Sequence, residues 1–523
     1  MAGRADSEGR RTAVGRPATA DTSADDGLAA VDGTAPADSR AGPSNSARTG
    51  RALVLASLTL LILVGVLAPS AAKPPLGPRG WAPGALPWAP ASATITIGLA
   101  AAYVIGAVGV LLSLRDPRPV PRVLVATLAV GALLTMPFGS ADHTNYAAYG
   151  RILLQGGDPW TASPIAWAGG HDPVTSGVQP PWQTTPSVYG PIAGLAQLLA
   201  AWLGGDNLRQ VVWIWQWVVV ATWLAGRWLL RRLIPDRPGL VDVLWTLNPL
   251  LFATAVLGAH VDLLATVCGV AALLLIRCST ARAWALAGVA AGTAIGIKVT
   301  AGVVLAAIVL AALARERERA AYGRLGALLA GAATVLIPAH LWAGWHTYDQ
   351  LGRSRRSISL ATPWRKAYEW SAGLLPDATL RTVVFAASAL ACVLLTLAVC
   401  RVANPPRRTP ADLALLLTLA LSFGYAAGAT YSLPWYDQLV WALLPALPGP
   451  CRMPLARLQL ARATVLGLGY VPGRVVGMSP AVESVTLGWR RDAAPAAAVA
   501  VWLVLLVWAV RPATRLSRPP PAR

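Results

Sequence analysis

The stretch Arg381–Cys400 reads RTVVFAASALACVLLTLAVC, and its one charged residue stands at its first position. A run of about 20 predominantly apolar residues is what an α-helix needs to cross about 30 Å of hydrocarbon. Comparable apolar runs recur along the chain, at 53–67, 93–114, 122–138, 208–230, 240–257, 261–277, 282–297, 299–314, 325–343, 411–430, 434–448 and 495–510. The pattern predicts an all-α polytopic integral membrane protein with about 12 to 14 transmembrane helices.

The composition points the same way. Of the 523 residues, 55% are hydrophobic and 13% are charged, and the mean hydropathy is +0.52. The charged share is about half of that in ordinary soluble domains, which excludes a soluble globular protein. An outer-membrane β-barrel is excluded as well, because its strands would alternate polar and apolar residues in segments of about 10.

Three regions follow from these patterns. Residues 1–50 are rich in Ala, Ser, Gly, Asp and Arg without any period, which is typical of a disordered tail. Residues 51–512 hold the apolar runs and form the predicted transmembrane domain. Residues 513–523 form a short second tail.

The net charge of +20 is concentrated in short loops between the apolar runs. By the positive-inside rule such loops face the cytoplasm, so we expect a plasma-membrane protein with both tails in the cytoplasm. The two long loops, 139–207 and 344–380, then lie outside the cell. The basic loops are Arg115–Arg122, Arg227–Arg237, Arg277–Arg282, Arg315–Arg324, Arg401–Arg408 and Arg511–Arg523. A nucleic-acid partner explains this poorly, because the charge is divided among many loops.

The second outer loop is more basic than the topology requires. It carries Arg353, Arg355, Arg356 and Arg365. The positive-inside rule does not call for arginines on this side. An anionic ligand at the outer membrane surface would account for them.

Asp142 is the first candidate for chemistry. It follows the apolar run 122–138, within the segment SADHTNYAAYGR at 140–151. A carboxylate at the membrane edge is partly desolvated, which raises its pKa and suits it to act as a general base. The structural alternative is a solvated loop aspartate near a helix end.

Three further ionisable residues stand at predicted outer helix ends. His260 and Asp262 follow Asn248-Pro249, where the proline should kink a helix, and Lys298 stands in a short turn between two apolar runs. One interpretation is structural, with a hydrogen-bonded His–Asp pair and a lysine that extends to the interface. The other interpretation is binding of a lipid phosphate or a sugar.

Aromatic residues accompany these polar groups. Trp182 and Tyr189 lie in a Pro-rich loop that we expect to be rigid, and Trp435 stands at another outer helix junction. A tryptophan at this depth is either an interfacial anchor or a surface for stacking a sugar. The polar candidates share the outer edge of the membrane, whereas a transporter site would lie near the midplane. This pattern favours an enzyme that works where lipid meets water.

Six short motifs occur in order along the chain. They are YAAYGR at 146–151, GDP at 157–159, TPSVYGP at 185–191, GAHVD at 258–262, GIK at 296–298 and PWY at 434–436. As a set, following Asp142, they resemble the GT-C glycosyltransferases. The closest resemblance is to the polyprenol-phosphomannose-dependent α-1,6-mannosyltransferases of lipomannan and lipoarabinomannan synthesis. That family more often has Gly-Gly-His-Asn-Asp where this chain has GAHVD.

The resemblance implies a GT-C membrane fold that transfers a mannosyl residue from polyprenyl-phosphate-mannose to a mannan or glycolipid acceptor. The transfer would invert the anomeric carbon on the extracytoplasmic face, with Asp142 as general base. Apart from the resemblance, we expect no metal or other cofactor. The donor phosphate would be held by Lys298, His260, Arg353, Arg355, Arg356 and Arg365. The acceptor or sugar would be held by Asp158, Trp182, Tyr189, Asp262 and Trp435.

Three alternatives stay open at this point. A related GT-C enzyme would use polyprenyl-phospho-arabinose or polyprenyl-phospho-glucose as the donor. A lipid-linked sugar transporter or flippase would use the same outer cations and would need no base. An inactive scaffold of an envelope-synthesis complex would transfer no sugar.

Overall fold

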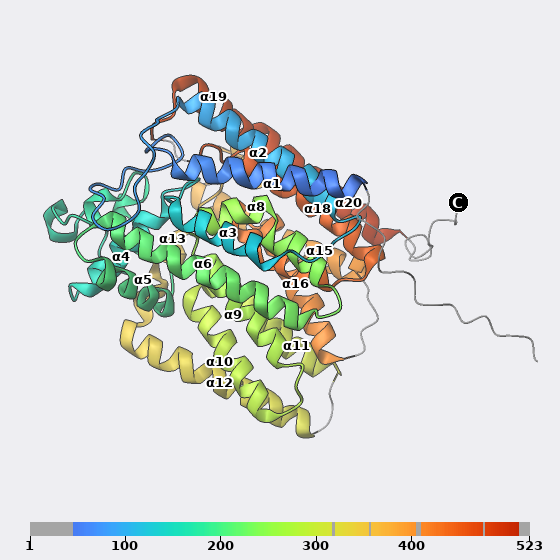
Figure 1. Ribbon diagram of the computed structural model, residues 1–523. Helices are drawn as coiled ribbons and strands as arrows, with labels where there is room; N and C mark the ends of the chain where they lie inside the picture. Colours follow the sequence, from blue (N-terminus) through green and yellow to red (C-terminus); the bar gives the residue numbers. More distant parts are fainter. Residues whose placement is uncertain (1–44, 316–318, 355–356, 404–408, 474–475, 512–523) are drawn as a thin grey trace, which may run out of the picture. The chain divides into compact units, whose positions relative to one another are not determined.

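The computed structural model describes residues 45–315, 319–354, 357–403, 409–473 and 476–511, and it is almost entirely helical (Figure 1). Across these ranges the β contacts are isolated bridges, such as the one between Leu67 and Leu86. The all-α prediction is confirmed. The predicted tail 513–523 and most of the predicted tail 1–50 lie outside the described residues.

Six helical segments within these ranges are long and apolar enough to cross a membrane. They are α1 (Asn45–Val66), α2 (Ser92–Ser113), α12 (Arg319–Ala343), α15 (Asp377–Ala403), α16 (Pro410–Gly428), and the run of α19 (Pro480–Gly488), η10 (Trp489–Ala493) and α20 (Ala494–Val510). Shorter apolar helices are α3 (Arg122–Leu134), α5 (Pro191–Gly204), α9 (Asp262–Leu275), α10 (Ala281–Ile297), and η6 (Val299–Ala301) with α11 (Gly302–Arg315). The chain is a multi-pass membrane protein, and the number of crossings stays a prediction.

One further candidate span is broken in its middle. The segments Pro238–Thr246 (α7 and η4) and Pro249–Leu257 (α8 and η5) form a pair bent by 40°. Pro249 has no backbone N–H to continue the first helix. The Asn248 side chain caps the second helix, because its Oδ1 accepts the N–H of Leu250 at 3.1 Å. The predicted kink at Pro249 is confirmed.

Helix α1 begins earlier than predicted. It starts at Asn45, inside the stretch 1–50 that we expected to be a disordered tail. Its first turns pack tightly on α2, since a Cβ added to Gly50 would lie 2.9 Å from the Gly109 carbonyl oxygen. Helix packing of this kind orders residues whose composition alone gives no helical period.

The chain after residue 430 also differs from the prediction. The expected span 434–448 is divided into η8 (Pro434–Asp437), α17 (Gln438–Leu443) and η9 (Leu444–Ala446), because prolines interrupt helical hydrogen bonding. Helix α18 (Gly449–Leu468) follows. The last span begins at Pro480, earlier than the predicted residue 495.

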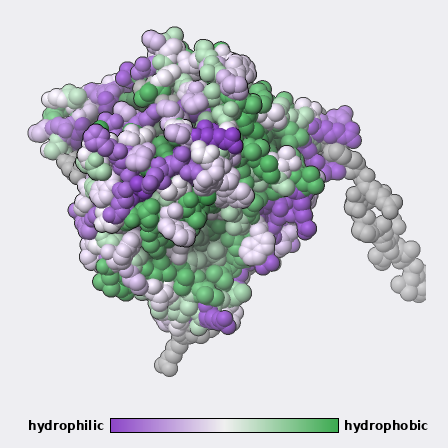
Figure 2. Space-filling view, turned by 60° about the vertical axis from the view of Figure 1, so that its left-hand side comes forward, coloured by the Kyte–Doolittle hydropathy of each residue, from purple (hydrophilic) through white to green (hydrophobic). Residues whose placement is uncertain are grey.

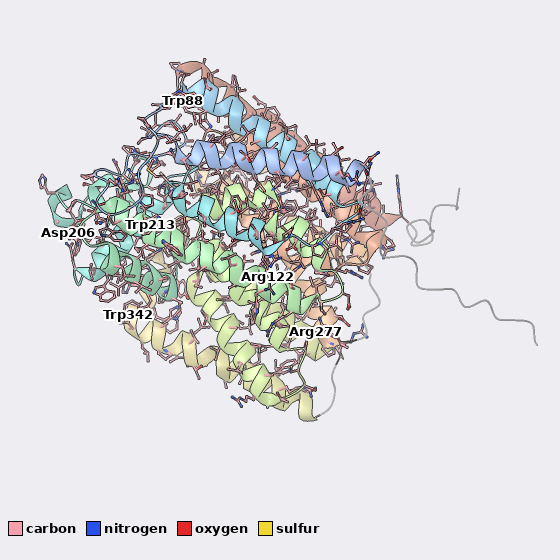
Figure 3. All side chains as sticks on the ribbon, in the orientation of Figure 1. Trp88, Arg122, Asp206, Trp213, Arg277 and Trp342 are labelled. Carbon is pink, nitrogen blue, oxygen red and sulfur yellow. The ribbon has the colours of Figure 1, made fainter. Side chains whose placement is uncertain are left out.

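Several basic loops meet at one end of the protein. Arg237 donates to the carbonyl oxygen of Leu447 at 2.6 Å, and Arg401 donates to that of Ala509 at 2.5 Å. Figure 3 places Arg122 and Arg277 toward this end and Asp206 and Trp342 toward the other. The grouping of the basic loops agrees with the predicted topology. Their cytoplasmic location stays a prediction.

The other end is built from the two long loops, which are folded. The loop 139–207 contains α4 (Asp142–Leu154), α5 and three short turns, η1 (Trp167–Gly170), η2 (Thr175–Gly177) and η3 (Trp182–Thr184). The loop 344–380 contains η7 (Trp345–Tyr348), α13 (Asp349–Ser354) and α14 (Pro363–Trp370). The remaining long helix, α6 (Leu208–Leu233), leads away from them. Figure 2 brings this end forward and shows hydrophilic residues mixed with hydrophobic ones, beside larger hydrophobic areas.

Candidate active site

Asp142 begins α4, directly after the chain leaves the apolar part of the molecule. The Asp142 backbone N–H donates to Ser140 Oγ at 3.2 Å, and carboxylate atom Oδ2 lies 3.5 Å from His260 Nδ1. Burial, followed by the negative charge of Asp262, raises the pKa of Asp142 to about 7, although Lys298 acts in the opposite direction. A carboxylate with this pKa is suited to accept a proton at neutral pH.

His260 lies under Trp435 and is almost completely buried. The two rings stack with their centroids 3.8 Å apart and their planes 13° from parallel. The imidazole nitrogens face α4 and the residues before it, with Nε2 3.4 Å from Ser140 Oγ and Nδ1 3.4 Å from Tyr146 Oη. His260 thereby connects η8, which carries Trp435, with α4, which carries Tyr146.

Burial lowers the pKa of His260 well below its ordinary value, and the charge of Lys298 lowers it further. The imidazole is therefore neutral at neutral pH. A neutral imidazole can still hydrogen-bond a donor phosphate, and the predicted role of His260 there stays a prediction. Its contacts fit a residue that orients Asp142.

Asp262 and Lys298 form the charged pair of the site. Asp262 begins α9, and Lys298 follows the last residue of α10. The Lys298 ammonium lies 2.5 Å from Asp262 Oδ1 and 4.0 Å from the ring centroid of Tyr436. Both charged side chains are largely buried. The carboxylate and the aromatic face hold the Lys298 side chain at a defined position.

Two tyrosines extend the cluster from the first loop. Tyr189 Oη donates to Tyr146 Oη at 3.4 Å, and their rings meet edge to face at 5.2 Å. Burial and the nearby carboxylates raise the pKa of Tyr146 well above its ordinary value. Tyr146 was missed as a site residue. Tyr146 stands four residues after Asp142, and this spacing puts both side chains on one face of a helix. The spacing is the sequence signal that could have identified Tyr146.

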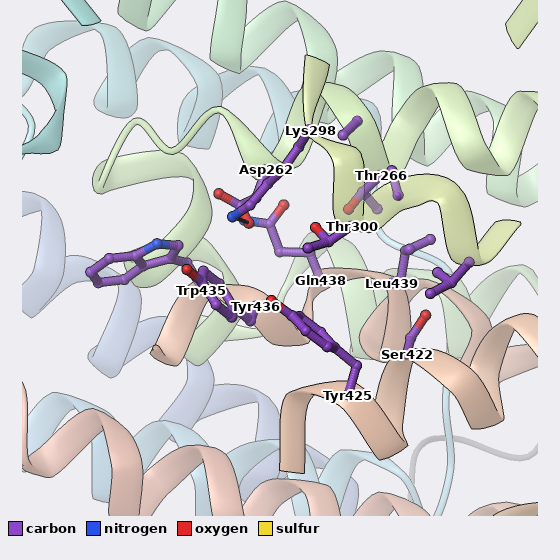
Figure 4. Close-up of a pocket in the computed structure, with 13 residues that line it drawn as sticks. Asp262, Thr266, Lys298, Thr300, Ser422, Tyr425, Trp435, Tyr436, Gln438 and Leu439 are labelled. Atoms are coloured by element: carbon purple, nitrogen blue, oxygen red, sulfur yellow. Dashed lines mark hydrogen bonds and ion pairs between the residues drawn. The ribbon is translucent and has the colours of Figure 1, made fainter. Parts of the chain in front are cut away.

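A cavity opens beside the charged pair. Figure 4 shows Asp262 and Lys298 at its edge, with Tyr425 and Ser422 from α16 and Gln438 from α17 around the same space. We call this space the chamber. Its lining residues are Asp262, Ala265, Thr266, Lys298, Thr300, Ala301, Val303, Ser422, Tyr425, Trp435, Tyr436, Gln438 and Leu439.

The structure thus brings six predicted site residues together. Contacts link Asp142, His260, Asp262, Lys298, Tyr189 and Trp435 into one continuous cluster. They come from five separate parts of the sequence. Their common property, a polar or aromatic group at a predicted outer helix end, is what the sequence could reveal.

Other predicted residues lie apart from this cluster. Asp158 pairs with His346 at 2.6 Å and joins the two long loops. Trp182 is 37% exposed on η3. Arg365 pairs with Glu369 at 2.7 Å on α14. Asp158 also accepts the backbone N–H of Trp160, whose indole N–H donates to the Tyr189 carbonyl oxygen, so it reaches the cluster only indirectly.

The remaining arginines of the second loop cannot be placed in the site. Arg355 and Arg356 lie outside the described residues, and for Arg353 only the backbone position at the end of α13 is described. Their predicted role at the donor phosphate stays a prediction. In the ranges the structure describes, no three His, Cys, Asp or Glu side chains are grouped to hold a metal ion.

Comparison with known proteins decides the family. A family model described as "Alpha-(1->6)-mannopyranosyltransferase, N-terminal domain" matches residues 53–314, about half of the chain. The chain belongs to the alpha-(1->6)-mannopyranosyltransferase family. The resemblance inferred from the six motifs is confirmed, and the matched region contains Asp142, His260, Asp262 and Lys298.

Two relatives align over part of their length. Alpha-(1->6)-mannopyranosyltransferase A of Mycobacterium tuberculosis is 29% identical over 226 residues, which cover 39% of this chain and 39% of the relative. A probable alpha-(1->6)-mannopyranosyltransferase of Mycolicibacterium smegmatis is 33% identical over 136 residues, which cover 25% and 24%. Among solved structures, apo ArnT from Cupriavidus metallidurans has a TM-score of 0.39 and 14% identity, over 74% of this chain and 76% of that one.

Proposed function

We propose that this protein transfers a mannosyl residue from polyprenyl-phosphate-mannose to a mannan or glycolipid acceptor, at the extracytoplasmic face of the plasma membrane. The observation that carries the proposal is the geometry around Asp142. A buried carboxylate with a pKa of about 7 lies 3.5 Å from a neutral imidazole, next to a lysine held by Asp262. Family membership supports mannose as the sugar.

In this mechanism Asp142 removes the proton from an acceptor hydroxyl as its oxygen attacks the anomeric carbon. The bond between that carbon and the phosphate oxygen breaks, and polyprenyl phosphate leaves. One displacement inverts the anomeric carbon, so a β-linked donor yields an α-linked product. A positioned general base contributes typically about 10²–10⁴-fold to the rate.

The leaving phosphate gains negative charge, and Lys298 is the cation placed to stabilise it. Its ammonium is fixed between Asp262 and the face of Tyr436. A cation that is already oriented stabilises developing charge without reorganisation. Lysine binds phosphate as a point charge. A lipid-linked donor also agrees with a site at the ends of apolar helices.

The test uses membranes from cells that lack this chain and are complemented with single variants. Radiolabelled polyprenyl-phosphate-mannose and a short α-1,6-mannoside are supplied, and the elongated product is measured. We expect transfer by the wild type, and a loss of about 10²–10⁴-fold in Asp142→Asn at equal expression. Asp116→Asn is the control, because Asp116 pairs with Arg118 outside the site.

Two results would overturn the proposal. Equal transfer by the wild type and Asp142→Asn would exclude Asp142 as the base. A wild type that transfers arabinose or glucose from the matching lipid, but not mannose, would keep the enzyme class and change the donor.

A further inference from the structure

Three buried side chains of the chamber carry polar atoms without a hydrogen-bond partner among the described residues. These atoms are Asp262 Oδ2, Ser422 Oγ, and both Oε1 and Nε2 of Gln438. Gln438 is 2% exposed, Ser422 is 5% exposed and Asp262 is 8% exposed. Buried polar atoms in folded proteins are nearly always hydrogen-bonded, so each exception needs an explanation. These three side chains line one space, while other unpartnered side chains of the described residues, such as Gln459, lie elsewhere.

The three groups reach the chamber from three different helices. Asp262 comes from α9, Ser422 from α16 and Gln438 from α17. Figure 4 shows them around the same space, with the hydroxyl groups of Thr266 and Thr300 nearby. Such convergence is what a binding site with a few placed polar groups requires.

The rest of the lining fits the non-polar side of a sugar ring. Tyr425 and Tyr436 lie nearly parallel, with their centroids 6.1 Å apart and their planes 16° from parallel. Ala265, Val303 and Leu439 complete an apolar wall. A pyranose presents C–H groups on its faces and hydroxyl groups around its edge. The chamber offers aromatic and apolar surface together with unpaired hydrogen-bonding atoms.

We infer that the chamber binds the mannosyl ring of the lipid donor and that Gln438 and Ser422 hydrogen-bond its hydroxyl groups. The inference rests on the proposed function. The donor sugar is favoured over the acceptor because Lys298 lines the chamber and the apolar helices α9, α11 and α16 contribute to its wall. The sugar is bonded directly to the phosphate that Lys298 would hold.

The chemistry of Gln438 suits this role. Its amide supplies one acceptor oxygen and two N–H donors, so it can pair with two neighbouring hydroxyl groups at once. The Ser422 hydroxyl can donate and accept. Asp262 Oδ2 accepts only, and its other oxygen holds Lys298. A site built to hydrogen-bond a hydroxyl rejects a ligand that lacks it.

The test measures binding of two lipids to purified protein in detergent, using quenching of tryptophan fluorescence. One lipid is polyprenyl-phosphate-mannose, and the other is polyprenyl phosphate without a sugar. We expect Gln438→Leu to weaken binding of the mannose lipid by about 5- to 30-fold, and Ser422→Ala by about 3- to 10-fold. Neither change should move the Kd of the sugar-free lipid by more than about twofold.

Gln459→Leu is the matched control. Gln459 lies in α18, is fully buried and also has both amide atoms unpaired among the described residues, but it does not line the chamber. We expect it to leave both Kd values unchanged. Replacing an unpaired buried amide with leucine should not lower the Tm. The Tm of Gln438→Leu therefore separates loss of recognition from loss of folding, and Ser422→Ala repeats the test if that variant does not fold.

Several outcomes decide the question. Unchanged binding of the mannose lipid in both variants would overturn the inference, as would equal weakening for both lipids. A rise in KM for the acceptor alone would assign the chamber to the acceptor. If the wild type prefers the mannose lipid and both variants lose that preference, but no membrane preparation transfers mannose, the chamber stands and the proposed function fails.

Discussion

Asp242 and Asp262 are both buried aspartates paired with cations, and they differ in how completely their oxygens are used. At the basic end, Asp242 accepts hydrogen bonds from Arg227, Arg231 and Thr246, and from the backbone N–H of Val120. In the candidate active site, Asp262 Oδ1 binds Lys298 and Oδ2 has no partner among the described residues.

The difference separates two uses of a buried charge. A carboxylate with every lone pair occupied holds helices together and leaves nothing for a ligand. A buried carboxylate with one oxygen unpaired has lost its hydrogen bonds to water without replacing them, and a ligand that donates a hydrogen bond to this oxygen removes that penalty. The same reasoning applies to Gln438 and Ser422. The predictions below test this distinction.

The largest effect is expected at Lys298. Lys298→Met removes the cation beside the leaving phosphate, and we expect kcat/KM for mannosyl transfer to fall about 10²–10³-fold. Lys298→Met should also lower the Tm, because it leaves the Asp262 carboxylate buried without its cation. The double variant Lys298→Met with Asp262→Asn removes both charges, so it should recover the Tm without recovering transfer. Recovery of transfer by the double variant would show that Lys298 only balances Asp262.

The next effect concerns Asp242 and appears in stability. Asp242→Asn leaves Arg227 and Arg231 without their carboxylate, and we expect the free energy of unfolding to fall by about 3 kcal/mol. Transfer per folded molecule should stay within about twofold, since Asp242 lies away from the chamber. Denaturant unfolding in detergent and the sugar-transfer assay measure the two quantities. A specific loss of transfer at unchanged stability would contradict the comparison.

The third effect is the pH dependence caused by Asp142. Because its pKa is about 7, kcat/KM should rise about tenfold per unit below pH 7 and level off above it. Stability should change in the opposite sense. The ordinary pKa is 3.8, so between about pH 4 and pH 7 the folded state binds more protons, and the free energy of unfolding falls as pH rises, by roughly 4 kcal/mol in all.

Asp142→Asn is the control for the pH dependence, because asparagine does not titrate. In that variant the decline of stability between about pH 4 and pH 7 should disappear. Asp116→Asn should retain it. A kcat/KM that stays flat through this range in the wild type would mean that Asp142 is ionised throughout and that burial is not the dominant influence on it.

Sequence reasoning found the charged residues of the site and two aromatic ones, and it missed several neutral polar residues. Asp142, Asp262 and Lys298 stand out because ionisable residues at the ends of apolar runs are uncommon. Ser422 and Gln438 do not stand out, since a serine or glutamine in or beside an apolar helix has many structural uses. Arg365 was predicted from the charge of its loop; the structure pairs it with Glu369, and its role at the donor phosphate stays a prediction.

The charge of His260 could not be read from the sequence either. A histidine beside an aspartate suggests a protonated ring, and the stacking of Trp435 from a distant segment reverses this by burying it. Desolvation depends on what covers a group. That information comes from segments far away in the chain.

The sequence by itself determined the membrane class, the positions of most apolar helices, the break at Pro249 and the family. These properties depend on composition and on local order, which a linear chain displays directly. Only the tertiary structure decided that Asp142, His260 and Trp435 meet, that the two long loops are folded, and that the unpaired atoms of Asp262, Ser422 and Gln438 share one chamber. Hydrogen-bond partners and burial are relations between distant segments, and they exist only once the helices have packed.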